Sequence, residues 1–177
     1  MRQIHRHALA LGLVLALSAC GSDPEPQFEA DPSPAPSEVT TSAPVKEAWE
    51  EKSPEGAVAF AEHWTATFSE AFQTGETSGL ESISSDSCQT CTTFIKLVRE
   101  VYEGGGSITG QPWQLRSPAW VESEDDVIVT GKMKIPGQVI SRSGQEPSRA
   151  AATSERYIFT IEWQGGAWQA ARLVRET

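Results

Sequence analysis

A short apolar run that ends in Leu17-Ser18-Ala19-Cys20 limits which part of this chain can fold into a domain. The stretch from residue 8 to residue 17 is too short to span a bilayer, and two basic residues, Arg2 and Arg6, precede it. A basic start, a short apolar segment and small residues before a cysteine are typical of a bacterial lipoprotein signal. We therefore expect residues 1–19 to be removed and Cys20 to carry a diacylglyceryl group.

An ordinary secretory signal with a cysteine near its cleavage site by chance is the alternative. It would leave an unpaired thiol at the exported terminus, whereas acylation removes that thiol. Two acyl chains on one residue also suffice for stable anchoring. No later apolar stretch is long enough to cross a membrane, so we expect the rest of the chain to lie on the outer side of the cell membrane.

Residues 20–53 are predicted to be the lipidated cysteine followed by a disordered linker. Six prolines lie in this segment, and eight acidic residues face only Lys46 and Lys52, without apolar periodicity. Such a composition cannot bury enough apolar surface to fold. As a random coil the linker would span roughly 30 Å. A docking motif within it is the alternative to a simple spacer.

The charge balance bears on the class of partner. Of 14 basic residues, Arg2 and Arg6 leave with the signal, so 12 remain against 24 acidic residues. Nucleic acids and anionic lipid headgroups both require clustered Lys and Arg, and the sequence has no basic run. The composition therefore argues against both as partners.

Residues 54–177 are long enough for one domain with its own core. Ser53 suits a helix N-cap and Pro54 the first helical position, and Gly75 suits the end of that helix. The expected buried face recurs at spacings of three and four and comprises Ala57, Phe60, Ala61, Trp64, Phe68, Ala71 and Phe72. A short helix is expected around 80–83, and a third from near Ser87 to the glycines at 104–106.

Strand patterns follow the helices. Segments 119–122 and 127–135 flank a polar turn, and segments 156–163 and 167–174 flank Gln164-Gly165-Gly166, a strong hairpin signal. Between the two hairpins, residues 136–153 are expected to form a long polar loop. Helices followed by antiparallel strands predict an α+β fold with the helices packed on one face of a curved antiparallel sheet.

This order of elements resembles the nuclear transport factor 2-like cone, in which a curved sheet wraps helices around a pocket. A second resemblance depends on a combination of features: the signal ending at Cys20, the Pro-rich spacer, the helix start at Pro54, the Cys88-Gln89-Thr90-Cys91 motif and the three glycines at 104–106. Together they look like a family of actinobacterial lipoproteins of unknown function. That resemblance implies a location and a fold, and it leaves the chemistry open.

Cys88 and Cys91 form the motif that is most suggestive of chemistry. At a helix start, the helix dipole stabilises a thiolate, as in disulfide oxidoreductases. No strand–helix–strand pattern surrounds the motif, however, and Cys91 falls on the apolar stripe of its helix. A buried structural disulfide worth about 2 kcal/mol is therefore the favoured interpretation. Redox activity is the alternative, and a metal site would need two further ligands.

The last hairpin supplies the predicted ligand site. A two-residue turn at Gly165-Gly166 pairs Trp163 with Trp168, and further along it pairs Phe159 with Arg172 and Tyr157 with Val174. The aromatic face should meet the helices, which would place Arg172 among apolar neighbours. There it could form an ion pair, or it could hold an anionic or polar ligand in a cone pocket. The predicted pocket residues are Tyr157, Trp163, Trp168 and Arg172, with residues 136–153 as a lid.

Two other candidate sites, His63 and the acidic turn at 124–126, have less support in the sequence. His63 is expected on the solvated side of the first helix, and it lacks a predictable partner for catalysis. The acidic turn at 124–126 could bind calcium weakly, although a solvated turn is the more common role. No catalytic residue, metal site or cofactor is predicted.

The sequence therefore predicts a membrane-anchored, surface-exposed lipoprotein with a non-catalytic module that binds a ligand or a protein at the cell envelope. The alternatives are a cone-pocket acid–base enzyme of the isomerase or dehydratase type, and a thiol-redox protein using Cys88 and Cys91. Thr160, Glu162 and Gln169 make the outer sheet face polar, which favours a monomer.

Overall fold

The computed structural model describes residues 46–124 and 126–176, which belong to a compact unit spanning Ser42–Thr177. The predicted signal, Cys20 and most of the predicted linker lie outside the described residues. None of the described helices is long and apolar enough to cross a membrane.

Three α-helices form where the sequence predicts them. Helix α1 spans Pro54–Thr74, α2 spans Ser78–Ser82 and α3 spans Gln89–Glu103. The Ser53 side chain accepts a hydrogen bond from the backbone N–H of Gly56, and Gly75 ends α1 in the left-handed conformation at φ 85°. A Cβ atom at residue 75 would also clash with the Tyr102 ring. Both the backbone conformation and the close packing therefore require glycine at this position.

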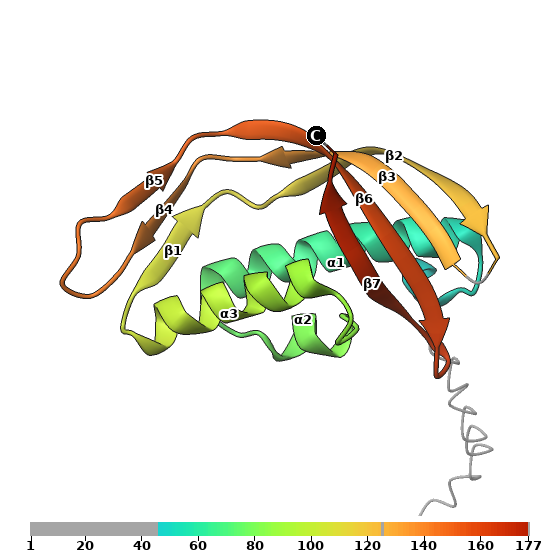
Figure 1. Cartoon of the computed structure of the whole chain (residues 1–177), viewed down its shortest axis with the longest axis horizontal. Coiled ribbons are helices and arrows are strands. Elements are labelled where there is room, and N and C mark those ends of the chain that lie inside the picture. Colours follow the sequence, from blue (N-terminus) through green and yellow to red (C-terminus); the bar gives the residue numbers. More distant parts are fainter. Residues whose placement is uncertain (1–45, 125, 177) are drawn as a thin grey trace, which may run out of the picture. The chain divides into compact units, whose positions relative to one another are not determined.

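Seven strands follow the helices and form two sheets (Figure 1). The main sheet is antiparallel in the order β2-β3-β6-β7, and the smaller sheet has the order β1-β4-β5. The strand bounds are β1 Ser107–Gly110, β2 Gln114–Ser123, β3 Asp126–Ile135, β4 Gln138–Ser141, β5 Ser148–Ala150, β6 Thr153–Gln164 and β7 Ala167–Arg175. Figure 1 shows the strands arching over α1 and α3, which confirms the predicted α+β fold with helices on one face of a curved sheet.

The segment predicted as a long polar loop contains two short strands. Within residues 136–153, β4 and β5 pair with each other, and β4 also pairs with β1. The loop prediction was wrong because these strands are short and largely polar, so they lack the alternating apolar pattern of a half-buried strand. The proposed lid is therefore part of a sheet.

The packed part of the chain begins before residue 54. Residues Ala48–Glu50 form a 3-10 turn, η1, and Trp49 packs against the core. The Trp168 indole Nε1 donates a 2.7 Å hydrogen bond to the backbone oxygen of Glu51. These contacts tie the last residues of the predicted linker to the folded domain.

The core lies between α1 and the main sheet. Trp64 is fully buried on α1 and meets Phe159 of β6 edge to face, with ring centroids 5.6 Å apart. Val98 and Val101 of α3 complete this layer. Burial of these apolar side chains is the main stabilising contribution to the domain.

Candidate functional site

One surface pocket lies at the end of the main sheet where two turns meet. Because β3 pairs antiparallel with β6, the turn after Ser123 and the turn at Gly165-Gly166 lie at the same end. The start of α1 closes the third side. The resulting pocket measures about 480 Å³, and we call it the tryptophan pocket. Its lining residues are Lys52, Ser53, Pro54, Glu122, Ser123, Glu124, Asp126, Val127, Trp163 and Trp168.

Two indole rings form one wall of this pocket. Trp163 and Trp168 are directly opposite each other in register, as predicted, with ring centroids 4.9 Å apart and ring planes at 81°. Trp168 is buried and is held by its hydrogen bond to Glu51. Trp163 is only half-buried, so one aromatic surface remains accessible beside a fixed one.

The other wall is predominantly acidic. Glu122, Glu124 and Asp126 line the pocket, against the single cation of Lys52. Indole faces attract cations through their quadrupole, and nearby carboxylates add a direct charge attraction. The arrangement therefore suits a positively charged organic group that also has apolar surface.

The predicted site residues are brought together only in part. A β-bulge between Thr160 and Ile161 shifts the register, so Arg172 pairs with Thr160 and Leu173 pairs with Phe159. Arg172 is consequently exposed and lines a different hollow on the outer face of the sheet, of about 700 Å³. Its predicted position among the inward apolar side chains was wrong, because a one-residue shift moves every following side chain to the other face.

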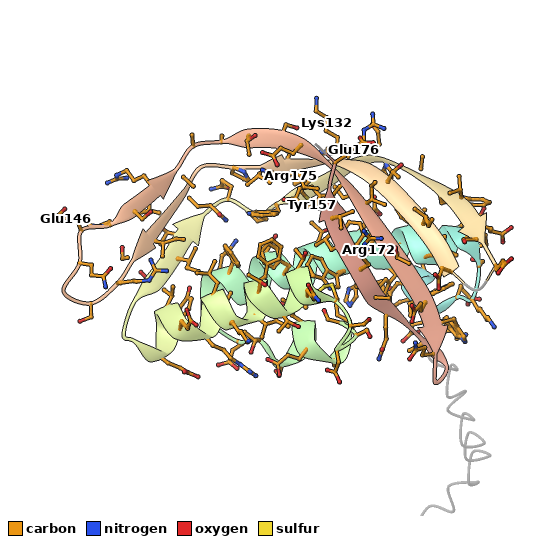
Figure 2. All side chains as sticks on the ribbon, in the orientation of Figure 1. Lys132, Glu146, Tyr157, Arg172, Arg175 and Glu176 are labelled. Atoms are coloured by element: carbon orange, nitrogen blue, oxygen red, sulfur yellow. A yellow bond between two sulfur atoms is a disulfide. The ribbon has the colours of Figure 1, made fainter. Side chains whose placement is uncertain are left out.

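Tyr157 faces the interior but lies away from the tryptophan pocket (Figure 2). It pairs in register with Arg175 at the far end of the hairpin. Burial raises the pKa of its hydroxyl, Glu155 raises it further, and Arg175 opposes the shift. The Tyr157 hydroxyl is therefore held in its neutral form.

The interior between helices and sheet is filled by aromatic rings. Phe68 of α1 contacts Phe72, Phe94 and Trp113, with centroid distances of 4.4, 4.8 and 4.8 Å. The backbone N–H of Trp113 donates to Ser69 Oγ at 2.9 Å, which fixes this tryptophan beside α1. Among residues 46–124 and 126–176, the buried polar side chains are Thr65, Ser69, Thr77 and Gln138. These rings fill the interior around Phe68, while a hollow of about 510 Å³ remains between α1 and β2, lined among others by Glu62, Glu70 and Trp113.

His63 is not on a fully solvated face, contrary to the prediction. Its ring stacks on Trp49 with centroids 4.1 Å apart and planes within 4° of parallel. Burial under Trp49 lowers the pKa of His63, and Glu47 partly counteracts this. The sequence could not indicate this partner because Trp49 lies in the segment predicted to be unstructured.

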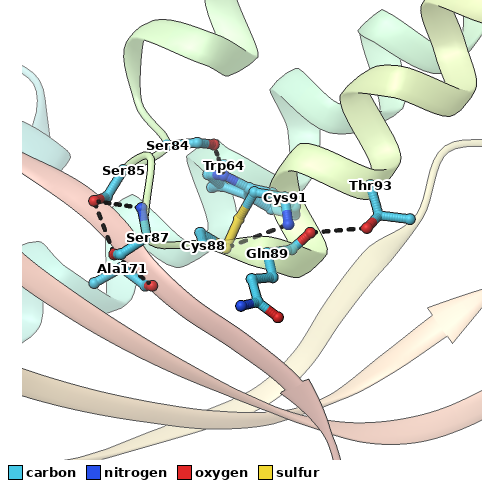
Figure 3. Close-up of a disulfide and its surroundings, with 9 residues drawn as sticks. All are labelled: Trp64, Ser84, Ser85, Ser87, Cys88, Gln89, Cys91, Thr93 and Ala171. Atoms are coloured by element: carbon cyan, nitrogen blue, oxygen red, sulfur yellow. Dashed lines mark hydrogen bonds between the residues drawn. A yellow bond between two sulfur atoms is a disulfide. The ribbon is translucent and has the colours of Figure 1, made fainter.

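Cys88 and Cys91 form a disulfide whose two cysteines are both buried (Figure 3). Cys88 caps α3, and its Sγ accepts a hydrogen bond from the backbone N–H of Cys91. This confirms the predicted buried disulfide. The redox alternative requires an exposed Cys88, whereas this residue is 1% exposed.

Between residues 46 and 176, leaving aside Asp125, no three His, Cys, Asp or Glu side chains are grouped to hold a metal ion. Asp125 of the predicted calcium turn lies outside the described residues.

The fold and pocket define an α+β domain of the helix-on-curved-sheet class with a small surface pocket. The chain belongs to a protein family of unknown function, DUF6318, whose model matches residues 42–173. No curated protein matches the sequence significantly.

Solved structures resemble this chain at low sequence identity. The intermembrane space region of the chloroplast protein ARC6 has a TM-score of 0.53 and 11% identity, over 71% of this chain and 97% of that chain. The Kfla4162 protein from Kribbella flavida has a TM-score of 0.48 and 9% identity, over 70% and 91% of the two chains. An NTF2-like protein with a cystatin-like fold from Novosphingobium aromaticivorans has a TM-score of 0.41 and 10% identity, over 68% and 80%.

Proposed function

We propose that this protein is a lipid-anchored, non-catalytic binding module at the outer face of the cell membrane, and that its ligand presents an organic cation to the tryptophan pocket. The segment ending at Cys20 supports the anchor, and the family resemblance supports an actinobacterial lipoprotein. The observation that carries the binding role is the Trp163–Trp168 pair facing Glu122, Glu124 and Asp126 across one pocket.

A cation bound in this pocket would be stabilised in two ways. Contact with the accessible Trp163 face contributes about 0.5–2 kcal/mol, depending on how far the cation is desolvated. The carboxylates add an attraction that weakens with salt because they are largely exposed. Both contributions are modest, so we expect a dissociation constant in the range of about 1–100 mM for an isolated ammonium group.

Titration of choline into the chain from Gly21 onward, followed by tryptophan fluorescence, tests the pocket. This chain keeps every described residue. The neutral carbon analogue 3,3-dimethyl-1-butanol has the same shape without the charge and should bind much more weakly. Trp163→Ala should abolish the choline response, whereas Trp120→Ala should retain it, because Trp120 is exposed and does not line the pocket. Equal binding of the charged and neutral compounds would refute a cation site.

The anchor is tested separately. A host that exports lipoproteins is grown with a labelled fatty acid, and the label should appear on the wild-type protein in the membrane fraction. Cys20→Ser should eliminate the label and release the protein. A label that persists in Cys20→Ser would contradict anchoring at this residue. We also propose that the domain acts as a monomer, which light scattering of the same chain measures directly.

A further inference from the structure

The main sheet gathers positive charges that are scattered in the sequence. Arg116 on β2 is in register with Lys132 on β3, and Lys132 is in register with Arg156 on β6. Three cations therefore occupy one row across three neighbouring strands. Lys134 lies two residues further along β3, where it pairs with Gln114 and Ser154. We call these four residues the basic row.

All four side chains are exposed. Figure 2 shows Lys132 projecting from the arch on the side away from the helices. Among the residues that the structure describes, only Arg156 of the four has an acidic partner, since its Nε lies 3.0 Å from a carboxylate oxygen of Glu176. Arg116 donates to the Gln114 side chain, and no ion pair within the described residues involves Lys132 or Lys134. The basic row with Glu176 thus carries a net charge of +3 on a chain whose net charge is −10.

This arrangement is unfavourable for the isolated domain. Like charges directly opposite each other on adjacent strands destabilise a sheet, and Lys132 has a cation on both sides. A carboxylate at residue 132 would form favourable pairs with both arginines instead. An anionic ligand would neutralise the row and relieve the same repulsion on binding.

We propose that the basic row binds a linear polymer of phosphate esters at the cell envelope. Neighbouring residues in register lie about 5 Å apart, so the three cations form a line perpendicular to the strands. A chain with repeating phosphates supplies negative charges along such a line, and arginine and lysine both bind phosphate oxygens well. A small anion would use only one or two of the four cations.

The basic row is separate from the tryptophan pocket. The chain enters the domain through η1, beside Trp168, whereas Arg156 lies near the opposite end of β6. The two sites have opposite charge and share no residue. The acidic composition argued against anionic partners, but the register of three strands creates a basic surface that no run in the sequence indicates.

Binding of a synthetic poly(glycerol phosphate) to the chain from Gly21 onward tests the proposal, measured by calorimetry at low salt. The affinity should fall steeply as salt is added. Lys132→Glu should weaken binding by at least about tenfold, because it reverses the central charge of the row. Its melting temperature should equal or exceed that of the wild type, since the new carboxylate lies between two arginines. Loss of binding would therefore not reflect unfolding.

Lys96→Glu is the matched control. Lys96 is an exposed lysine on α3, outside the basic row, and its substitution changes the net charge by the same amount. It should bind the polymer nearly as well as the wild type. Equal loss in both variants would overturn the proposal in favour of a net-charge effect, and unchanged binding by Lys132→Glu would also overturn it.

Two further probes identify the source of the phosphate. Glycerol phosphate monomer should bind far more weakly than the polymer if the row recognises a chain. Vesicles containing phosphatidylglycerol present the same headgroup on a surface, and binding to vesicles without binding to the polymer would overturn the proposal in favour of a membrane contact. Trp163→Ala should bind the polymer normally, so failure of the tryptophan pocket and failure of the basic row are distinguishable.

Discussion

The indole Nε1 of Trp64 donates a 2.9 Å hydrogen bond to Ser84 Oγ and thereby joins the centre of α1 to the segment before α3. That segment lies along the free edge of β7. The backbone N–H of Ser85 donates to the Ala170 oxygen, and the Ala170 N–H donates to the Ile83 oxygen, each at 3.0 Å. The outer edge of the main sheet is thus covered by backbone that Trp64 holds in place (Figure 3).

Trp64→Phe should destabilise the domain by about 2–4 kcal/mol, because it removes the donor and leaves unfilled volume in a fully buried position. Ser84→Ala should cost about 1–3 kcal/mol by leaving the indole N–H without an acceptor. Urea unfolding of both variants and of the double variant measures their coupling. Additive losses would mean that the hydrogen bond contributes nothing beyond packing.

Replacing Cys88 and Cys91 together by alanine should lower the free energy of unfolding by about 2 kcal/mol, because the disulfide closes a very short loop. The folded domain and its response to choline should persist. Unfolding curves with and without a reductant provide the measurement. A folded double variant that no longer binds choline would indicate that the cysteines have a functional role.

Arg172→Ala should leave choline binding and thermal stability nearly unchanged, because the bulge places Arg172 outside the tryptophan pocket. Fluorescence titration and thermal melting check both expectations. Weaker choline binding in this variant would show that the outer hollow and the tryptophan pocket are coupled. A lowered melting temperature would show instead that the exposed guanidinium stabilises the sheet.

The free energy of unfolding of the domain should decrease as the pH falls below about 6.5, because histidine titrates in this range. Because burial lowers the pKa of His63 in the folded state, the unfolded chain binds more protons there, and stability rises with pH. In the chain from Gly21 onward His63 is the only histidine. Histidine titrates between about pH 5 and pH 8. His63→Gln should therefore flatten the dependence of the urea midpoint on pH in this range. An equally steep dependence in this variant would assign the effect to carboxylates.

The helices were predictable because their signals are local. The N-cap at Ser53, the left-handed turn at Gly75 and the apolar stripe between them all act within a few residues. The Gly165-Gly166 turn likewise fixed the pairing of Trp163 with Trp168. The other half of the tryptophan pocket was not predictable, because Glu122 and Asp126 reach it only through the pairing of β3 with β6.

The sequence by itself determined the order of elements, the ends of the helices, the tight turn of the last hairpin and the buried face of α1. Tertiary structure decided which side of the sheet Arg172 occupies, how far the interior is filled, and that Arg116, Lys132 and Arg156 form one row. The physical reason is that side chains in a strand alternate between faces, so a single bulge reverses them. The bulge lies where residues 83–85 bond the edge of β7, and contacts between such distant segments leave no periodic signal in the chain.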